Sequence, residues 1–221
     1  DEVSILLDRT DKKDPNSNEE AMASLRISVK SKDPDLVGRM FTAKMIELAL
    51  ANYPGFFTGG GVRSGGPVLV YWPALIDSKH IKETVHIDGK KIDVMPTNQL
   101  DLEETYYQKQ PIEIPSAPSG ETINKPLGML FGARSGDKGG CANIGVWAKN
   151  ENAFSFLNNF LTVKKIKELM PDLREFKIDR YELPNILSLN FYIHDILEDG
   201  VSSNTRKDGQ AKSLGEYLRA K

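Results

Sequence analysis

Strict alternation of apolar and polar residues predicts several β-strands in this chain. In "ASLRISVKS" (23–31) every second side chain is apolar, which is typical of a strand with one buried face. "FKIDRY" (176–181) and "LSLNFYIH" (187–194) alternate in the same way. "TVHIDGKKIDV" (84–94) alternates on both sides of Asp88-Gly89, a residue pair that favours a two-residue hairpin turn.

Apolar residues at helical spacing predict four helices. Asp33 and Pro34 are typical of a first helical turn, and this helix should continue to about residue 52. We expect its apolar side, with Leu36, Met40 and Ile46, to pack on the strand at 23–31. Shorter helices are expected at 154–160, at 163–170 with Thr162 as the N-cap, and at 211–218.

A proline-rich segment, 96–123, separates two predicted modules. Residues 1–95 are predicted to form a β-α-β-β-β module in which "VLVYW" (68–72) is one of the strands. Residues 124–221 are predicted as β-β-α-β-β-α, with strands at 126–133 and 142–149 on either side of a glycine-rich loop. The predicted fold class is α+β in two layers, with a C-terminal antiparallel sheet covered by helices on one face.

Composition and charge exclude several classes of protein. A net charge of −2 gives no general attraction to nucleic acid or acidic lipid, and no apolar run is long enough to span a membrane. The single cysteine, Cys141, fits a reducing compartment, so we expect a cytoplasmic protein. The three histidines show no metal-ligand spacing, and nothing in the sequence indicates a metal or a cofactor. Because the first residue is Asp1, we expect a segment of a longer or processed chain.

The strongest candidate for chemistry is "GARSGDKGGCANIGVW" (132–147), which holds five glycines between charged residues. Glycines in a loop can point several N–H groups into one anion-binding concavity, and Arg134 and Lys138 can pair with phosphate or carboxylate. The segment matches neither the P-loop nor the dinucleotide-binding motif. The predicted ligand-binding residues are Arg134, Ser135, Gly136, Asp137, Lys138, Gly139, Gly140 and Asn143.

Simpler explanations remain open for each candidate. The glycine-rich loop could be a plain hairpin turn held by an Arg134–Asp137 or an Asp137–Lys138 ion pair. Cys141 lacks a visible His–Asp partner, so we interpret it as a small packed residue. His194 precedes an aspartate and could be an oriented base, although an exposed imidazole is the default. No catalytic residue is assigned, and whether the chain is an enzyme stays open.

Three blocks of the sequence resemble the C-terminal part of the acyclic terpene utilisation protein AtuA family. These blocks are "GARSGDKGGCANIGVWAKN", "RYELPNILSLNFYIHDIL" and "GVSSNTRKDGQAKSLGEYL", and residues before 95 look like the end of the family's larger N-terminal domain. The resemblance implies a ferredoxin-like fold for the C-terminal part and a link to acyclic terpene breakdown through CoA thioesters. It also implies that most of the N-terminal domain lies outside this chain.

Two functions follow as hypotheses. In the first, a metabolic protein of terpene or acyl-CoA catabolism binds an anionic small molecule, such as a CoA thioester, at the glycine-rich loop. In the second, the domain is a non-catalytic assembly module that forms a homo-oligomer or docks to the missing N-terminal domain. Nucleic-acid binding is disfavoured because the predicted strands lack paired exposed aromatic residues, and we expect no membrane partner.

Overall fold

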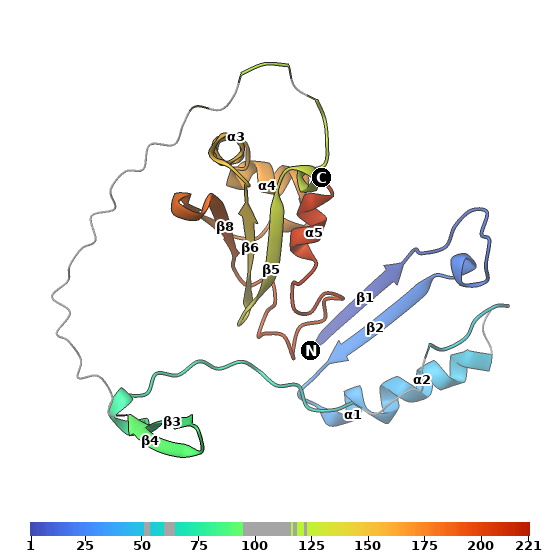
Figure 1. Cartoon of the computed structure of the whole chain (residues 1–221). Coiled ribbons are helices and arrows are strands. Elements are labelled where there is room, and N and C mark those ends of the chain that lie inside the picture. Colours follow the sequence, from blue (N-terminus) through green and yellow to red (C-terminus); the bar gives the residue numbers. More distant parts are fainter. Residues whose placement is uncertain (51–53, 60–64, 95–115, 117–118, 122) are drawn as a thin grey trace. The chain divides into compact units, whose positions relative to one another are not determined.

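The computed structural model describes residues 1–50, 54–59, 65–94, 116, 119–121 and 123–221 (Figure 1). Contacts divide the chain into two units. One unit comprises Asp1–Leu69 with Ser202–Gly209, and the other comprises Val70–Val201 with Gln210–Lys221. The predicted linker at 96–123 falls almost wholly outside the described residues, so the predicted module boundaries stay predictions.

The second unit contains a four-stranded antiparallel sheet. Its strands are β5 (Gly132–Lys138), β6 (Cys141–Trp147), β7 (Ile178–Leu183) and β8 (Ser188–Ile193), in the order β5-β6-β8-β7. Three helices accompany the sheet in Figure 1: α3 (Glu151–Phe160), α4 (Val163–Leu169) and α5 (Leu214–Arg219). The predicted α+β class with an antiparallel C-terminal sheet is confirmed.

The helices begin where the sequence provides caps. The side chain of Asn150 accepts a hydrogen bond from the N–H of Ala153 at the start of α3. Thr162 accepts one from the N–H of Lys165 at the start of α4, so the predicted N-cap is confirmed. Pro171 then begins a short 3-10 turn, Pro171–Leu173, because proline cannot continue the α-helical ladder. Two further 3-10 turns lie at Leu127–Met129 and Pro184–Ile186.

One face of this sheet builds the core. Side chains alternate along each strand, so Ala142, Ile144 and Val146 of β6 share a face with Leu189, Phe191 and Ile193 of β8. These six side chains are buried against the helices, and we call this side the core face. The opposite side is the open face. Among the described residues, every buried apolar side chain lies between Phe131 and Leu218.

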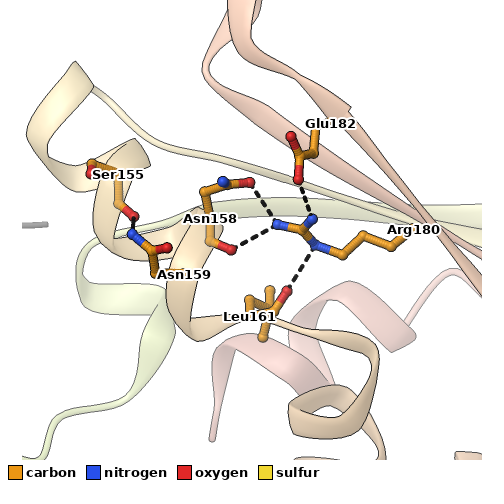
Figure 2. Close-up of polar contacts among 6 residues, drawn as sticks. All are labelled: Ser155, Asn158, Asn159, Leu161, Arg180 and Glu182. Carbon is orange, nitrogen blue, oxygen red and sulfur yellow. Dashed lines mark hydrogen bonds and ion pairs between the residues drawn. The ribbon is translucent and has the colours of Figure 1, made fainter. Parts of the chain in front are cut away.

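An arginine of β7 closes the end of α3 (Figure 2). The guanidinium of Arg180 donates to the carbonyl of Asn158 at 2.7 Å, to the Asn158 side chain at 2.6 Å, and to the carbonyl of Leu161 at 3.2 Å. It also pairs with Glu182 at 2.5 Å. Because the last carbonyls of a helix lack partners within the helix, Arg180 satisfies acceptors that α3 leaves open and ties α3 to the sheet.

The first unit contains a two-stranded hairpin and two helical segments. Strands β1 (Glu2–Asp8) and β2 (Ser24–Lys30) pair antiparallel, after which α1 (Pro34–Val37) and α2 (Arg39–Leu50) follow. A 3-10 turn, Glu19–Ala21, lies between the strands. The polar side of the hairpin carries ion pairs and hydrogen bonds to Ser202–Gly209: Lys30 donates to the Ser203 carbonyl at 2.9 Å, and Lys207 pairs with Asp8 at 2.5 Å. Its apolar side carries Val3, Ile5 and Leu7 opposite Val29, Ile27 and Leu25.

The predicted hairpin at 84–94 is confirmed. Strands β3 (Glu83–Ile87) and β4 (Lys90–Val94) pair on either side of Asp88 and Gly89, and a 3-10 turn, Ser78–His80, precedes them. Asp88 and Gly89 have φ angles of 48° and 74°. Positive φ at both central residues is what a type I′ hairpin turn requires, and this explains the Asp-Gly pair.

Three predictions for the chain before residue 132 are wrong, and a fourth, the first helix, is confirmed only with an interruption. "VLVYW" (68–72) is not a strand, and the strand predicted at 126–133 begins only at Gly132. The helix predicted over 34–52 breaks at Gly38, and its last two residues lie outside the described residues. The prediction that this helix packs on the strand at 23–31 is also wrong. The side chains expected in that contact are between 43% and 63% exposed: Leu25, Leu36, Met40 and Ile46.

Candidate functional site

The segment predicted as a glycine-rich loop is a β-hairpin. Residues 132–138 form β5, which pairs with β6 in continuous register from Gly132↔Trp147 to Lys138↔Cys141. Only Gly139 and Gly140 make the turn, and Gly139 has the positive φ of 66° that such turns use. The loop prediction is therefore wrong. Main-chain groups that alternate along a paired strand cannot converge into an anion-binding concavity.

Close contacts explain two of the glycines. A Cβ at Gly132 would lie 2.2 Å from the Trp147 ring, so the indole occupies the space of the missing side chain. A Cβ at Gly140 would lie 2.1 Å from the main-chain oxygen of Glu198, which leaves no room for any side chain at the hairpin turn. These glycines are required by packing between distant parts of the sequence, and this requirement does not depend on a ligand.

Alternation along β5 divides the predicted site residues between the two faces. Arg134, Gly136 and Lys138 lie on the open face with Asn143, because Gly136 is the register partner of Asn143. Ser135 and Asp137 lie on the side of the core face. The Ser135 hydroxyl accepts a hydrogen bond from the N–H of Gly215 in α5 at 2.9 Å. The structure thus brings together about half of the predicted residues and assigns Ser135 a contact with the helix.

The charged groups of β5 are not paired with one another. The hairpin of the simpler explanation is present, but among the described residues neither the Arg134–Asp137 nor the Asp137–Lys138 ion pair that was expected to hold it is formed. Within the part of the chain that the structure describes, the guanidinium of Arg134 and the carboxylate of Asp137 have no hydrogen-bond or ion-pair partner. The ammonium of Lys138 donates to the main-chain oxygen of Asp137 at 2.9 Å. Internal electrostatics therefore does not explain the charges of this strand.

Three further residues adjoin this part of the open face, and the sequence analysis did not select them. Asn190 of β8 accepts a hydrogen bond of 2.9 Å from the side-chain amide of Asn143. The ammonium of Lys212 lies 3.4 Å from where a Cβ at Gly136 would be. The indole of Trp147 lies over Gly132, as described above. Asn190 and Trp147 alternate in sequence with the buried residues of their strands, and this alternation could have placed them on the open face. The position of Lys212 depends on the path of a loop and could not have been predicted in this way.

A second polar cluster lies farther along the open face. The Nε2 atom of His194 is 2.7 Å from Oδ2 of Asp179, so His194 is oriented by an acid, although by Asp179 instead of the adjacent Asp195. The hydrogen bond from His194 lowers the pKa of Asp179. The Tyr192 ring contacts the His194 ring edge to face, with centroids 4.9 Å apart. A hydrogen bond with Cys141, helped by desolvation, raises the pKa of Tyr192 to about 12.

The sheet and its helices coincide with a family domain. Residues 126–221 match the model of the AtuA ferredoxin-like domain, and residues 1–87 match that of the Acyclic terpene utilisation family protein AtuA. The chain belongs to the AtuA family. No significant match was found among curated proteins or among solved structures.

All eight predicted site residues of this AtuA-family chain lie inside the ferredoxin-like domain. Two depressions lie elsewhere and contain none of these residues. One of about 400 Å³ is lined by Leu127, Phe160, Leu169 and neighbouring residues, and one of about 360 Å³ is lined by residues of β2, α1 and α2 with 65–68. The AtuA candidate site lies on the open face of the sheet, beside the cations of Arg134 and Lys212 and the amides of Asn143 and Asn190.

Aromatic side chains also lie on this face of the AtuA domain. Trp147 and Tyr181 are 40% and 51% exposed, whereas the sequence analysis expected no paired exposed aromatic residues on the strands. The described part of the chain contains no group of His, Cys, Asp or Glu side chains placed to hold a metal ion. None of its described helices has the length and apolar character needed to cross a bilayer.

Proposed function

We propose that this AtuA-family chain binds an anionic small molecule on the open face of its ferredoxin-like sheet. The supporting observation is the exposed guanidinium of Arg134, which has no partner within the described residues. The family description, acyclic terpene utilisation, suggests a metabolic role in which a CoA thioester or a related phosphate or carboxylate supplies the anion. The cytoplasmic location stays a prediction.

Arg134 is the central group of the proposed site. A planar guanidinium matches the two oxygens of a carboxylate or phosphate, and such charge-assisted hydrogen bonds are stronger than neutral ones. Gly136 lies two residues farther along the same face, so β5 itself places no side chain between Arg134 and Lys138. The ammonium of Lys212, close to Gly136, adds positive charge to the same region. Gly136 is itself buried, and the end of the Lys212 side chain lies next to where a side chain of residue 136 would begin.

The two asparagines would give the site its polar specificity. One hydrogen bond joins Nδ2 of Asn143 to Oδ1 of Asn190, and this bond uses one polar atom of each amide. Among the described residues the other two polar atoms, an acceptor and a donor, have no side-chain partner. They can therefore bind neutral polar groups of a ligand whose anionic group is held by Arg134.

Assembly through the same face is the second candidate function. Trp147, Tyr181 and Leu183 expose apolar area on the open face, and interface cores are enriched in aromatic residues. In that case a second copy or another domain would cover the aromatic side chains. Sedimentation of the chain at increasing concentration tests this alternative without a ligand.

A thermal-shift titration with pyrophosphate, citrate and coenzyme A tests anion binding. A ligand that binds the folded chain raises its melting temperature by mass action. We expect Arg134→Ala to weaken the effective anion by about 1.5–3 kcal/mol, the usual loss for a charged hydrogen bond. Arg174→Ala is the matched control, because Arg174 is exposed and its guanidinium makes one long hydrogen bond of 3.4 Å. Equal weakening by both substitutions, or no shift with any anion, would contradict the proposal.

A further inference from the structure

The exposed indole beside Arg134 indicates what kind of anion the open face takes. Ring atoms of Trp147 lie 2.2 and 2.3 Å from the position of a Cβ at Gly132. The indole, through its Nε1, Cε2 and Cζ2 atoms, therefore lies directly against the main chain of β5 at this glycine. The side chain is still 40% exposed, so the ring also presents surface to solvent. A supported and accessible indole is suited to stack against another planar ring.

The aromatic and cationic groups follow one another along β5. Gly132, Arg134 and Gly136 are alternate residues on one face, so successive positions are separated by about 7 Å. The first position holds the Trp147 ring, the second the unpaired guanidinium, and the third the Lys212 ammonium. A planar ring followed by two cations matches the order of base, sugar and phosphates in a nucleotide.

We infer that the ligand of the open face is a nucleoside diphosphate or a molecule that contains one. Its base stacks on Trp147, and its phosphates bind Arg134 and Lys212. This inference rests on the proposed function, because it names the chemical class of the anion. Tryptophan and arginine bind a base through stacking and cation–π contact, and this kind of binding does not require recognition of a particular base.

The floor of the site favours a nucleotide over an aliphatic anion. Next to the indole and Arg134 lie Gly145, Asn143 and Asn190, so the surface beyond Arg134 offers amide groups and main chain. An aliphatic tail lying there would desolvate these amides without giving them partners. Ribose hydroxyls and base edges carry donors and acceptors that can pair with them.

A long nucleic acid is the less suitable ligand. The chain has a net charge of −2, whereas polynucleotide binding depends on many phosphate contacts along a basic surface. The open face also carries the carboxylate of Asp179 in the same row as Tyr192. One stacked ring and two phosphate contacts are enough for a single nucleotide and not for a strand.

Intrinsic fluorescence provides a direct test. The chain has two tryptophans, Trp72 and Trp147, so the Trp72→Phe variant reports on Trp147 alone. We expect ADP to quench this fluorescence saturably, and we expect pyrophosphate, which lacks the base, to bind more weakly without strong quenching. Calorimetric titration should show ADP binding weakened about 5- to 150-fold in Trp147→Leu, the range for loss of a stacked base. Pyrophosphate binding should stay unchanged in that variant.

Two further variants separate this inference from the proposed function. Trp147→Phe keeps a ring over Gly132 and should retain most of the ADP affinity, which shows that a loss in Trp147→Leu is not caused by unfolding. Arg134→Gln should weaken ADP and pyrophosphate together. If pyrophosphate binds as tightly as ADP and Trp147→Leu changes neither, the anion site stands and the nucleotide inference is overturned. If neither ligand binds, both are overturned, and tighter binding of oligo(dT) than of ADP would overturn the inference in favour of single-stranded nucleic acid.

Discussion

The hydroxyl of Ser135 accepts a 2.9 Å hydrogen bond from the main-chain N–H of Gly215, which ties α5 to the edge strand of the sheet. At the same place the helix comes very close to the strand, since a Cβ at Gly215 would lie 3.2 Å from the carbonyl carbon of Arg134. The main chain that carries Arg134 on the open face is thus held by a helix on the core face. The geometry of the proposed site and the packing of α5 are therefore coupled through Arg134 and Ser135 of β5.

Gly215→Val should destabilise the domain. A side chain at this position meets the main chain of β5, which cannot move aside without disturbing the sheet, and overpacking of this kind costs about 1–3 kcal/mol. Urea unfolding followed by circular dichroism measures the change. Gly66→Val is the control, because nothing lies within 4 Å of its Cβ position. An unchanged midpoint for Gly215→Val would show that α5 does not pack closely on β5.

Truncation of a core residue should have a large effect, and truncation in β2 a small one. Ile144 is fully buried, so Ile144→Ala should lower the free energy of unfolding by about 2–5 kcal/mol. Leu25 is 60% exposed, so Leu25→Ala should change it by less than about 0.5 kcal/mol. Thermal melts of both variants are the measurement. A large loss for Leu25→Ala would mean that the apolar side of the β1–β2 hairpin is covered.

Arg180→Met should separate α3 from the sheet. The substitution keeps an unbranched apolar stem but leaves the carbonyls of Asn158 and Leu161 without their donor, at an expected cost of about 1–3 kcal/mol. Hydrogen exchange should become faster at the end of α3 before it changes in β6. Arg174→Met, at an exposed position, should leave both stability and exchange unaltered. Equal exchange in the two variants would contradict a capping role for Arg180.

The Asp179–His194 contact should make stability fall in acid. The hydrogen bond from His194 holds the folded-state pKa of Asp179 below its usual value of about 3.9. A carboxylate with a lowered pKa stabilises the fold above that usual value, and this stabilisation is lost as pH falls through the folded-state pKa. The difference in melting temperature between wild type and Asp179→Asn should therefore be present at neutral pH and close in acid.

Asp137→Asn is the control for this pH dependence, because the Asp137 carboxylate has no partner among the described residues. Its melting temperature should follow that of the wild type at every pH. If the melting temperatures of wild type and Asp179→Asn still differ at pH values below the folded-state pKa of Asp179, the carboxylate charge is not what stabilises the contact.

The sequence predicted those parts of the fold that depend on local pattern. The alternation around Leu189 and Phe191 located β8 and its buried face, and Thr162 located the start of α4. These signals succeed because burial on one face and capping are decided within a few residues. The Asp88-Gly89 turn was equally local.

The sequence failed where distant contacts decide the structure. Glycines usually weaken a strand, and the glycine-rich residues 134–140, most of which belong to β5, were predicted as a loop. Gly132 and Gly140 are nevertheless compatible with the hairpin because Trp147 and the Glu198 carbonyl fill the space of their side chains. The same limit applies to the candidate site. Arg134 and Asn143 could be selected from their neighbours in sequence, whereas Lys212 joins them only through the path of the chain before α5.

Alternation in β6 has a consequence for how this protein can change. Ala142, Ile144 and Val146 carry the packing, while Cys141, Asn143 and Gly145, which alternate with them, lie on the opposite face. Saturation mutagenesis along β6 should therefore show that tolerance to substitution alternates from residue to residue. Few substitutions should be accepted at the buried positions, and many at the positions on the opposite face. The chemistry of the open face can then diverge by single substitutions while the interior sequence, and with it the capacity to fold, is inherited unchanged.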